Sequence, residues 1–98
     1  MRPKKIEVNG KEVTIKLDLN AIIRFCENYD IDFSGWESAL NHPTKIRYFI
    51  WSMAKSGNPD SDITEEEIGS MAIEDMTSIM DSIGEQADPK KGKKGKKE

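Results

Sequence analysis

One short stretch of the chain carries residue types that can bind a metal ion. In YDIDFSGWESALN, over residues 29–41, Asp30, Asp32 and Ser34 occupy alternate positions and Gly35 follows. Oxygen-bearing side chains at positions one, three and five, with glycine at position six, form the first half of an EF-hand calcium loop. The first question is whether these residues hold calcium or shape the backbone.

The second half of the same stretch departs from the calcium pattern. Position twelve, where the loop requires a bidentate glutamate, is Asn41, and position eight, which is usually apolar, is Glu37. Aspartate and serine also occur where helices end and begin, because their side chains bond to nearby backbone amides. We therefore interpret Asp30 and Asp32 as turn residues and Ser34 as the cap of the next helix, and we expect no metal site.

The other reactive residue types do not assemble a catalytic site. His42, the single histidine, stands beside Pro43, where a turn or capping role is usual. Cys26, the single cysteine, lies on the inward face of an expected helix, where a thiol packs as a small apolar group. The sequence contains neither a glycine-rich phosphate loop nor a Cys/His ligand cluster. We expect a protein that is not an enzyme and uses no cofactor.

Charge is distributed unevenly along the chain. The net charge is −3, but residues 88–98 hold six lysines against Asp88 and Glu98, a net of +4, so residues 1–87 carry −7. Nucleic acid binds clustered positive charge, so an acidic body is a poor surface for it. We expect no nucleic-acid partner for the body. Contact of the Lys/Gly segment with nucleic acid or an acidic protein stays open, and we interpret this segment as a disordered, solubilising tail.

The length of 98 residues suits one folded domain, which we assign to residues 1–87. No apolar run approaches the roughly 20 residues of a membrane span. The opening MRPKKIEVNG lacks the apolar segment of a signal peptide. A single cysteine excludes an internal disulfide and fits a reducing compartment. The sequence therefore predicts a cytoplasmic protein that does not engage a membrane.

The N-terminal segment has the pattern of a β-hairpin, which we place at residues 4–17. Apolar and charged residues alternate on both sides of Asn9-Gly10. Asn-Gly readily adopts the positive φ angles of a type I′ turn, whose twist matches that of paired strands. An isolated hairpin is marginal in water, so its apolar face must pack on another element. The apolar residues are Ile6, Val8, Val13, Ile15 and Leu17.

A small bundle of four to five short helices is expected over about residues 20–86, which makes the fold class α+β. Asn20 is placed to cap the first helix, and a second begins near Ser34. Pro43 suits the first turn of a third helix, which runs to about Lys55 before the break SGNPDSD. The expected inward residues of the first helix are Ile22, Phe25, Cys26 and Tyr29.

Two further helices close the expected domain. Thr64 and Glu67 form a capping-box pattern at the start of a short helix, with Ile68, Met71 and Ala72 facing inward. The last helix, roughly residues 74–85, has an apolar stripe at helical spacing. This stripe consists of Met76, Ile79, Met80 and Ile83.

The third helix carries more apolar residues than one core face of a small domain buries. Aromatic and thioether side chains suit a surface that repacks against a partner helix or a second subunit. The alternative is that these side chains fill an irregular core, and both interpretations stay open. The candidate partner-binding residues are Trp36, Tyr48, Phe49, Trp51, Met53, Met76 and Met80.

Four segments of the sequence follow one another in a fixed order over residues 4–86. They are IEVNGKEVTIKLDL, NAIIRFCENYDIDF, IRYFIWSMAKSG and DITEEEIGSMAIEDMTSIMDSIGEQ. A hairpin, a helix ending near a tyrosine, a tryptophan-containing helix ending in a small-residue break, and a TEEEIG helix start follow one another. In this order the chain resembles the tail assembly chaperones of long-tailed (siphovirus-type) bacteriophages and prophages.

The resemblance implies a role without catalysis. Such chaperones coat the long, helical, aggregation-prone tape-measure protein in the host cytoplasm, help bring tail-tube subunits to it, and are absent from the finished particle. Many are also made in an extended form by a programmed ribosomal frameshift, so the lysine pairs from Lys90 to Lys97 are a candidate record of a slippery site. Other classes stay open: a structural virion protein such as a connector or tail-completion subunit, and a calcium-responsive or nucleic-acid-binding regulatory domain.

Overall fold

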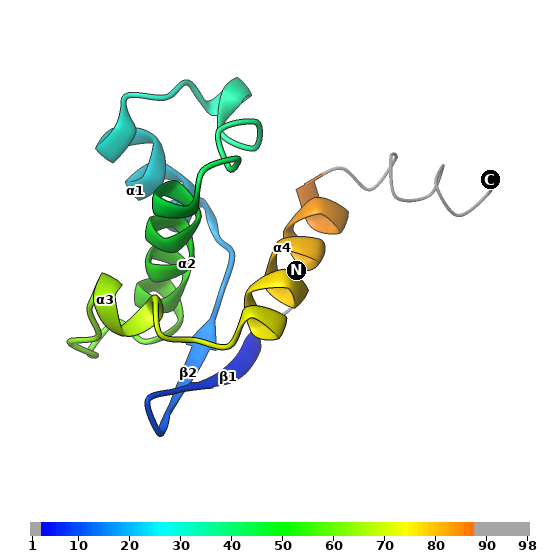
Figure 1. The fold of residues 1–98 in the computed structure, drawn as a ribbon. Helices are drawn as coiled ribbons and strands as arrows, with labels where there is room; N and C mark the ends of the chain where they lie inside the picture. The colour runs from blue at the N-terminus through cyan, green and yellow to red at the C-terminus, as the bar shows by residue number, and fades with distance from the viewer. Residues whose placement is uncertain (1–2, 88–98) are drawn as a thin grey trace.

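The structure is a computed structural model that describes residues 3–87. The expected Lys/Gly tail, residues 88–98, lies outside the described residues. An antiparallel hairpin precedes four α-helices in the described part, which confirms the α+β class (Figure 1). The elements are β1 (Lys4–Val8), β2 (Lys11–Ile15), α1 (Leu19–Tyr29), the 3₁₀ helix η1 (Phe33–Gly35), α2 (Pro43–Gly57), α3 (Glu65–Ile68) and α4 (Ile73–Ala87).

The hairpin forms where the alternating pattern predicts it. The strands pair from Lys4 opposite Ile15 to Val8 opposite Lys11. Asn9 and Gly10 have φ angles of 54° and 78°, the positive values that the Asn-Gly turn requires. The inward face of the two strands is buried against the helices, and it consists of Ile6, Val8, Val13 and Ile15.

The cap of α1 differs from the prediction. The helix begins at Leu19, and its N-cap is Asp18 rather than Asn20. The Asp18 carboxylate accepts the Ala21 backbone N–H at 2.9 Å and the Ser56 hydroxyl at 2.8 Å. Asp18 therefore caps α1 and ties it to α2 with the same oxygen, which Asn20, exposed within the first turn, does not do.

The stretch after α1 is irregular, and the helix expected from Ser34 is replaced by the single turn of η1. Asp30 ends α1 in the left-handed conformation at φ 55°, which confirms its turn role. Asp32, not Ser34, occupies the N-cap position of η1, and no side-chain hydrogen bond caps that turn. Trp36 follows η1 and points into the core, where it is 7% exposed.

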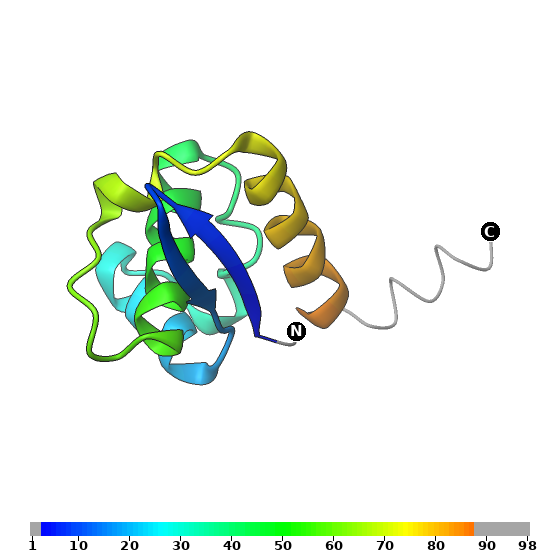
Figure 2. The same cartoon turned by 90° about the horizontal axis from the view of Figure 1, so that it is seen from below.

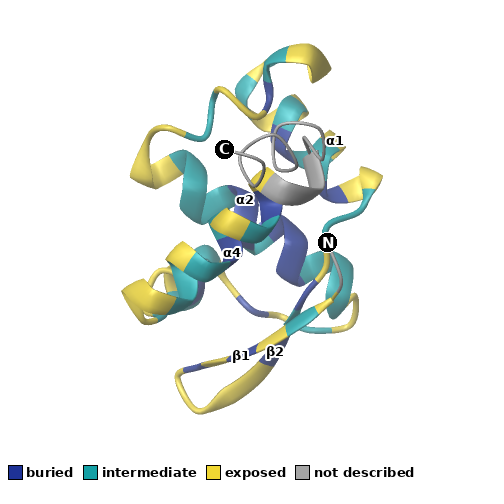
Figure 3. Cartoon of the chain, turned by 90° about the vertical axis from the view of Figure 1, so that its right-hand side faces the viewer, coloured by how far each residue is buried: buried dark blue, intermediate teal, exposed yellow. Residues whose placement is uncertain are grey.

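Helix α2 is the centre of the fold and packs against α1, β2 and α3 (Figure 1). It begins at Pro43 as predicted and ends at Gly57, close against the hairpin. A Cβ on Gly57 would overlap the carbonyl oxygen of Thr14 and lie 2.9 Å from its carbonyl carbon, so only glycine fits there. Burial on several sides explains the broad apolar character of α2. The buried residues in α2 are Phe49, Ile50, Ser52, Met53 and Ala54 (Figure 3).

The two C-terminal helices frame the open side of α2. Thr64 and Glu67 form the predicted capping box of α3, and Ile68 is buried. Ala72, expected to face inward, is exposed in the link between α3 and α4. Helix α4 lies beside β1 in both views of the ribbon (Figures 1 and 2). Ile79 and Ile83 of its apolar stripe are fully buried.

Candidate functional site

Asp30 and Asp32 are not part of a metal-ligand cluster. Within residues 3–87, no group of three or more His, Cys, Asp and Glu side chains is arranged to hold a metal ion. Asp30 ends α1 in the left-handed backbone conformation. The backbone N–H of the next residue, Ile31, donates a hydrogen bond to the Cys26 carbonyl at 2.9 Å. Asp30 therefore acts as a turn residue at the end of α1.

The two residues of intrinsic reactivity, Cys26 and His42, lie on different elements. Cys26 is half-buried on α1, and burial raises the pKa of its thiol, with the Asp32 and Glu27 carboxylates acting in the same direction. A raised pKa keeps the thiol protonated and weakly nucleophilic at neutral pH. His42 is exposed at the N-cap position of α2 and makes no side-chain capping bond there.

Three of the predicted partner-binding residues lie in the core. Phe49 and Met53 are fully buried, and Trp36 is nearly so. The Trp36 indole stacks on the Phe49 ring, with centroids 5.1 Å apart and planes at 26°. Phe25 meets the Phe49 ring edge-on, with centroids 5.0 Å apart. In this conformation these side chains fill the space between α1, η1 and α2, and none of them is presented to a partner.

Tyr48 and Trp51 lie at the margin of the core. The Trp51 Nε1–H donates to the Ile63 carbonyl at 2.8 Å, and the indole lies against Tyr48, with ring centroids 5.3 Å apart. Tyr48 in turn meets Tyr29 edge-on at 5.5 Å. Burial raises the pKa of the Tyr48 hydroxyl, and the nearby Glu65 carboxylate raises it further. Both side chains are half-buried, so each presents only part of its ring to the surface.

An open apolar groove lies between the first half of α2, the end of α3 and the start of α4. Its volume is about 340 Å³. This falls within the range of about 300–1,000 Å³ that is usual for binding pockets. We call it the α2–α4 groove. Its lining residues are Pro43, Thr44, Ile46, Arg47, Ile50, Ile68, Gly69, Met71, Ile73 and Met76.

Of the partner-binding residues predicted from the sequence, Met76 alone lines the α2–α4 groove, whereas Met80 is half-buried farther along α4. Ile73, which the sequence reasoning missed, stands at the edge of the groove with 69% of its surface exposed. An apolar residue at the first position of a helix, before an otherwise well-spaced apolar stripe, is a signal that could have identified Ile73. The sequence alone does not show that Ile46 and Ile50 line a groove, because this depends on where α4 begins relative to α2.

Arg47 is the cationic residue in the lining of the groove. Its Nη2 lies 3.9 Å from Glu65 Oε1, beyond hydrogen-bond distance. Its Nε is buried and has no acceptor among the described residues. Its aliphatic stem passes beside Gly69, where a Cβ would lie 3.0 Å from the Arg47 Cδ. Gly69 therefore leaves the space that lets the guanidinium reach the wall of the groove.

A second apolar surface lies on α1 and η1. Leu19, Ile23 and Phe33 are 62%, 41% and 64% exposed, respectively. We call these three residues the α1 patch. Leu19 and Phe33 line a shallow hollow together with Ile22 and Trp36. Both surfaces are largely apolar, so they suit the docking of apolar side chains.

Comparisons with known proteins give no match from which a function could be transferred to this chain. No protein-family model, curated protein or solved structure matches the chain. None of the helices in residues 3–87 has both the length and the apolar character needed to span a membrane.

Proposed function

We propose that this protein is a tail assembly chaperone, which binds apolar helical segments of a phage tape-measure protein without catalysis and helps bring tail-tube subunits to it. The observation that carries the proposal is the α2–α4 groove, an apolar hollow open at the surface of an otherwise acidic body. Helix-in-groove recognition uses such a hollow to take up the apolar face of a partner helix. The order of elements along the sequence supports the same proposal.

The charge of the body gives the proposal a physical mechanism. Residues 3–87 contain eight Lys and Arg against sixteen Asp and Glu, a net of −8. A client helix that lies in an apolar groove has its own apolar stripe covered, while the acidic exterior repels other copies of the complex. The expected consequence is a client that stays dispersed until its assembly partners displace the chaperone.

Co-expression tests the proposal. The chain is produced together with a phage tape-measure protein, and the soluble fraction of that protein is compared with its soluble fraction when produced alone. We expect the soluble fraction to rise several-fold in the presence of the chain. An unchanged soluble fraction would contradict the chaperone function.

Purified particles provide the second arm of the test. A chaperone of this kind acts before the tail is complete and is absent from the finished virion, whereas a connector or tail-completion subunit stays in it. We therefore expect mass spectrometry of purified particles to find no peptides of this chain. Their presence at a stoichiometry of whole subunits would favour a structural role.

A further inference from the structure

The α2–α4 groove has two properties that restrict what can occupy it. Its floor is apolar, formed by side chains such as Ile46, Ile50 and Ile68 from α2 and α3. Its wall contains the guanidinium of Arg47, whose Nε is buried and has no acceptor among the described residues. The Arg47 Nη2 forms a long ion pair with Glu65 Oε1 at 3.9 Å, beyond hydrogen-bond distance. A guanidinium forms its strongest hydrogen bonds with a carboxylate, often through two parallel N–H donors.

The charges around the groove set a further restriction. Glu65 and Glu66 lie at the start of α3, and Glu74 and Asp75 lie at the start of α4, so both helices that border the groove begin with acidic residues. A partner helix with many carboxylates would be repelled by these residues, whereas one carboxylate opposite Arg47 would be attracted. Charge complementarity therefore favours a partner that is basic or neutral apart from one acidic position.

We propose that the α2–α4 groove binds an amphipathic helix of a partner protein, and that one Asp or Glu beside the apolar stripe of this helix pairs with Arg47. The helix places apolar side chains at i, i+3 or i+4, and i+7 on the floor of the groove. Ile73 closes over the edge of the bound helix. This inference rests on the proposed function only for the choice of a helical partner, since the acidic position follows from Arg47.

The test uses designed helical peptides of about 18 residues, long enough to form a helix in water. Each carries leucine at the stripe positions and lysine or glutamine elsewhere. A series moves a single glutamate around the stripe, and a reference peptide has glutamine throughout. Binding to the full chain is measured by fluorescence anisotropy of the labelled peptide. We expect one glutamate position to strengthen binding about tenfold over the reference, as for a charge-assisted hydrogen bond.

Matched variants identify the groove and the cation. Arg47→Gln should remove the advantage of the glutamate peptide, whereas Lys45→Gln, the same charge change outside the groove lining, should preserve it. Arg47→Glu should restore tight binding to a peptide with lysine at the favoured position.

Ile73→Glu should weaken the binding of all peptides about tenfold or more, whereas Ile23→Glu on the α1 patch should not. Ile73 is exposed and begins α4, where a carboxylate is compatible with the helix N-terminus, so this variant is expected to fold.

Several results would overturn the inference. They are the absence of binding by every peptide in the series, binding that is unchanged by Ile73→Glu, and an equal response to Arg47→Gln and Lys45→Gln. Self-association of the chain that Ile73→Glu abolishes, seen by sedimentation equilibrium, would show that a second copy occupies the groove instead.

The co-expression assay keeps this inference separate from the proposed function. If the chain keeps the tape-measure protein in solution and the Ile73→Glu variant does so equally well, the chaperone function stands and the groove is not its docking site. If peptides bind as expected but the tape-measure protein is not kept in solution, the groove stands as a helix site and the chaperone function fails.

Discussion

Two serines on α2 differ in their side-chain hydrogen bonding. Ser52 is fully buried, and its hydroxyl has no hydrogen-bond partner among the described residues. Ser56, one turn later, donates its hydroxyl to the Asp18 carboxylate at 2.8 Å. A buried hydroxyl without a partner is destabilising, whereas a hydrogen bond to a charged group is favourable. The two positions therefore predict opposite effects for the same substitution.

Ser52→Ala is expected to raise the free energy of unfolding by about 0.5–1 kcal/mol, because the unsatisfied hydroxyl is removed and alanine is the better helix former. Ser56→Ala is expected to lower it by about 1 kcal/mol, because the bond to Asp18 is lost. Urea denaturation of the two variants and the parent chain provides the measurement. Equal stability changes of the same sign in both variants would contradict the hydrogen bonding of α2 described above.

The cap of α1 gives a second prediction at this scale. Asp18→Ala is expected to lower the free energy of unfolding by about 1–2 kcal/mol, since the cap and the link to Ser56 disappear together. Asn20→Ala is expected to change it by less than about 0.5 kcal/mol. Thermal denaturation followed by circular dichroism distinguishes them. A larger loss of stability in Asn20→Ala than in Asp18→Ala would indicate that Asn20, as the sequence suggested, caps α1.

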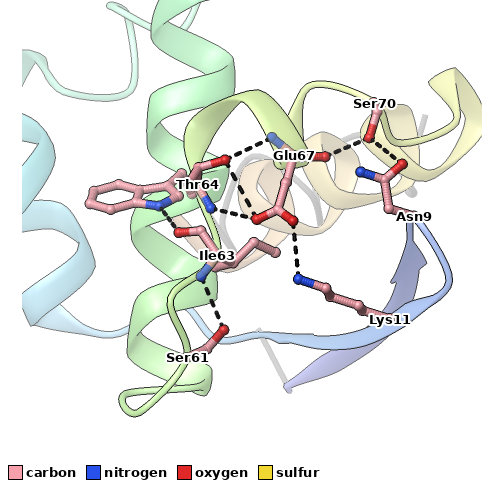
Figure 4. A network of polar contacts seen from close by, with 8 residues as sticks. Asn9, Lys11, Ser61, Ile63, Thr64, Glu67 and Ser70 are labelled. Atoms are coloured by element: carbon pink, nitrogen blue, oxygen red, sulfur yellow. Dashed lines mark hydrogen bonds and ion pairs between the residues drawn. The ribbon is translucent and has the colours of Figure 1, made fainter.

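At the scale of elements, a polar network joins the hairpin turn to α3 (Figure 4). Lys11 Nζ lies 3.0 Å from Glu67 Oε2, and the Ser70 hydroxyl donates to Asn9 Oδ1 at 3.1 Å. Glu67 also accepts the backbone N–H of Thr64 through its other carboxylate oxygen. One glutamate thus completes the capping box and holds the tip of the hairpin beside α3.

This network predicts a specific loss of stability in acid. Hydrogen bonds from the Thr64 backbone and from Lys11 lower the pKa of Glu67 from 4.5. A carboxyl group whose pKa is lowered by folding stabilises the fold above its unfolded pKa and loses this contribution as the pH falls. The urea midpoint should therefore drop below about pH 4.5 in the parent chain, and the drop should be smaller in Glu67→Gln.

Glu66→Gln supplies the control for this titration, because Glu66 is the exposed neighbour of Glu67 on the same turn. It should keep the parent's acid dependence. Lys11 behaves in the opposite sense: its pKa is raised from 10.5 by the hydrogen bond to Glu67, so its contribution is present below 10.5 and is lost as the pH rises through the folded value. An acid drop that is identical in Glu67→Gln and the parent would refute the role of Glu67.

Helix α4 is held differently from α3. Within residues 3–84, whose side chains are described, no side-chain hydrogen bond or ion pair joins α4 to another element, and the Ser82 hydroxyl bonds within α4 itself. The helix is docked by apolar side chains, chiefly Ile79 and Ile83. Among the residues whose side chains are described, its attachment therefore depends on apolar packing.

Truncation of the α4 stripe tests this attachment. Ile83→Ala is expected to lower the free energy of unfolding by about 2–5 kcal/mol, because it leaves a cavity in the core. Ile73→Ala, at an exposed position of the same helix, should change it by less than about 0.5 kcal/mol. Hydrogen exchange should also show faster exchange of α4 amides in Ile83→Ala than in the parent. Equal effects of the two substitutions would mean that α4 is not docked through its stripe.

At the scale of the whole molecule, several features that depend on neighbouring residues agree with the sequence prediction. The Asn-Gly turn, Pro43 and the capping box depend on neighbouring residues, so each was found at its predicted position. The helix expected at Ser34 is reduced to the single turn of η1, and Trp36, which follows it, stacks on Phe49, a residue distant in sequence.

The candidate site was harder to predict than the fold, for a physical reason. Residue character identified aromatic and thioether side chains, but Phe49 and Met53 turned out to lie inside, where α2 is surrounded by other elements. The groove depends on the position at which α4 begins relative to α2, and this position is fixed by packing between segments distant in sequence. The role of Arg47 likewise follows from the space beside Gly69, which no local pattern encodes.

The neighbouring positions of β1 and α4 have a consequence for synthesis on the ribosome (Figure 2). The first strand and the last helix of the described chain contribute to one core, so the inner face of the hairpin stays incompletely covered until the last helix has left the exit tunnel. Folding that begins at the N-terminus can therefore close only after translation of the domain is nearly finished. A nascent chain stalled before residue 73 should remain sensitive to protease at the hairpin. A nascent chain that carries residues 1–98 and a linker long enough to clear the tunnel should become resistant to protease.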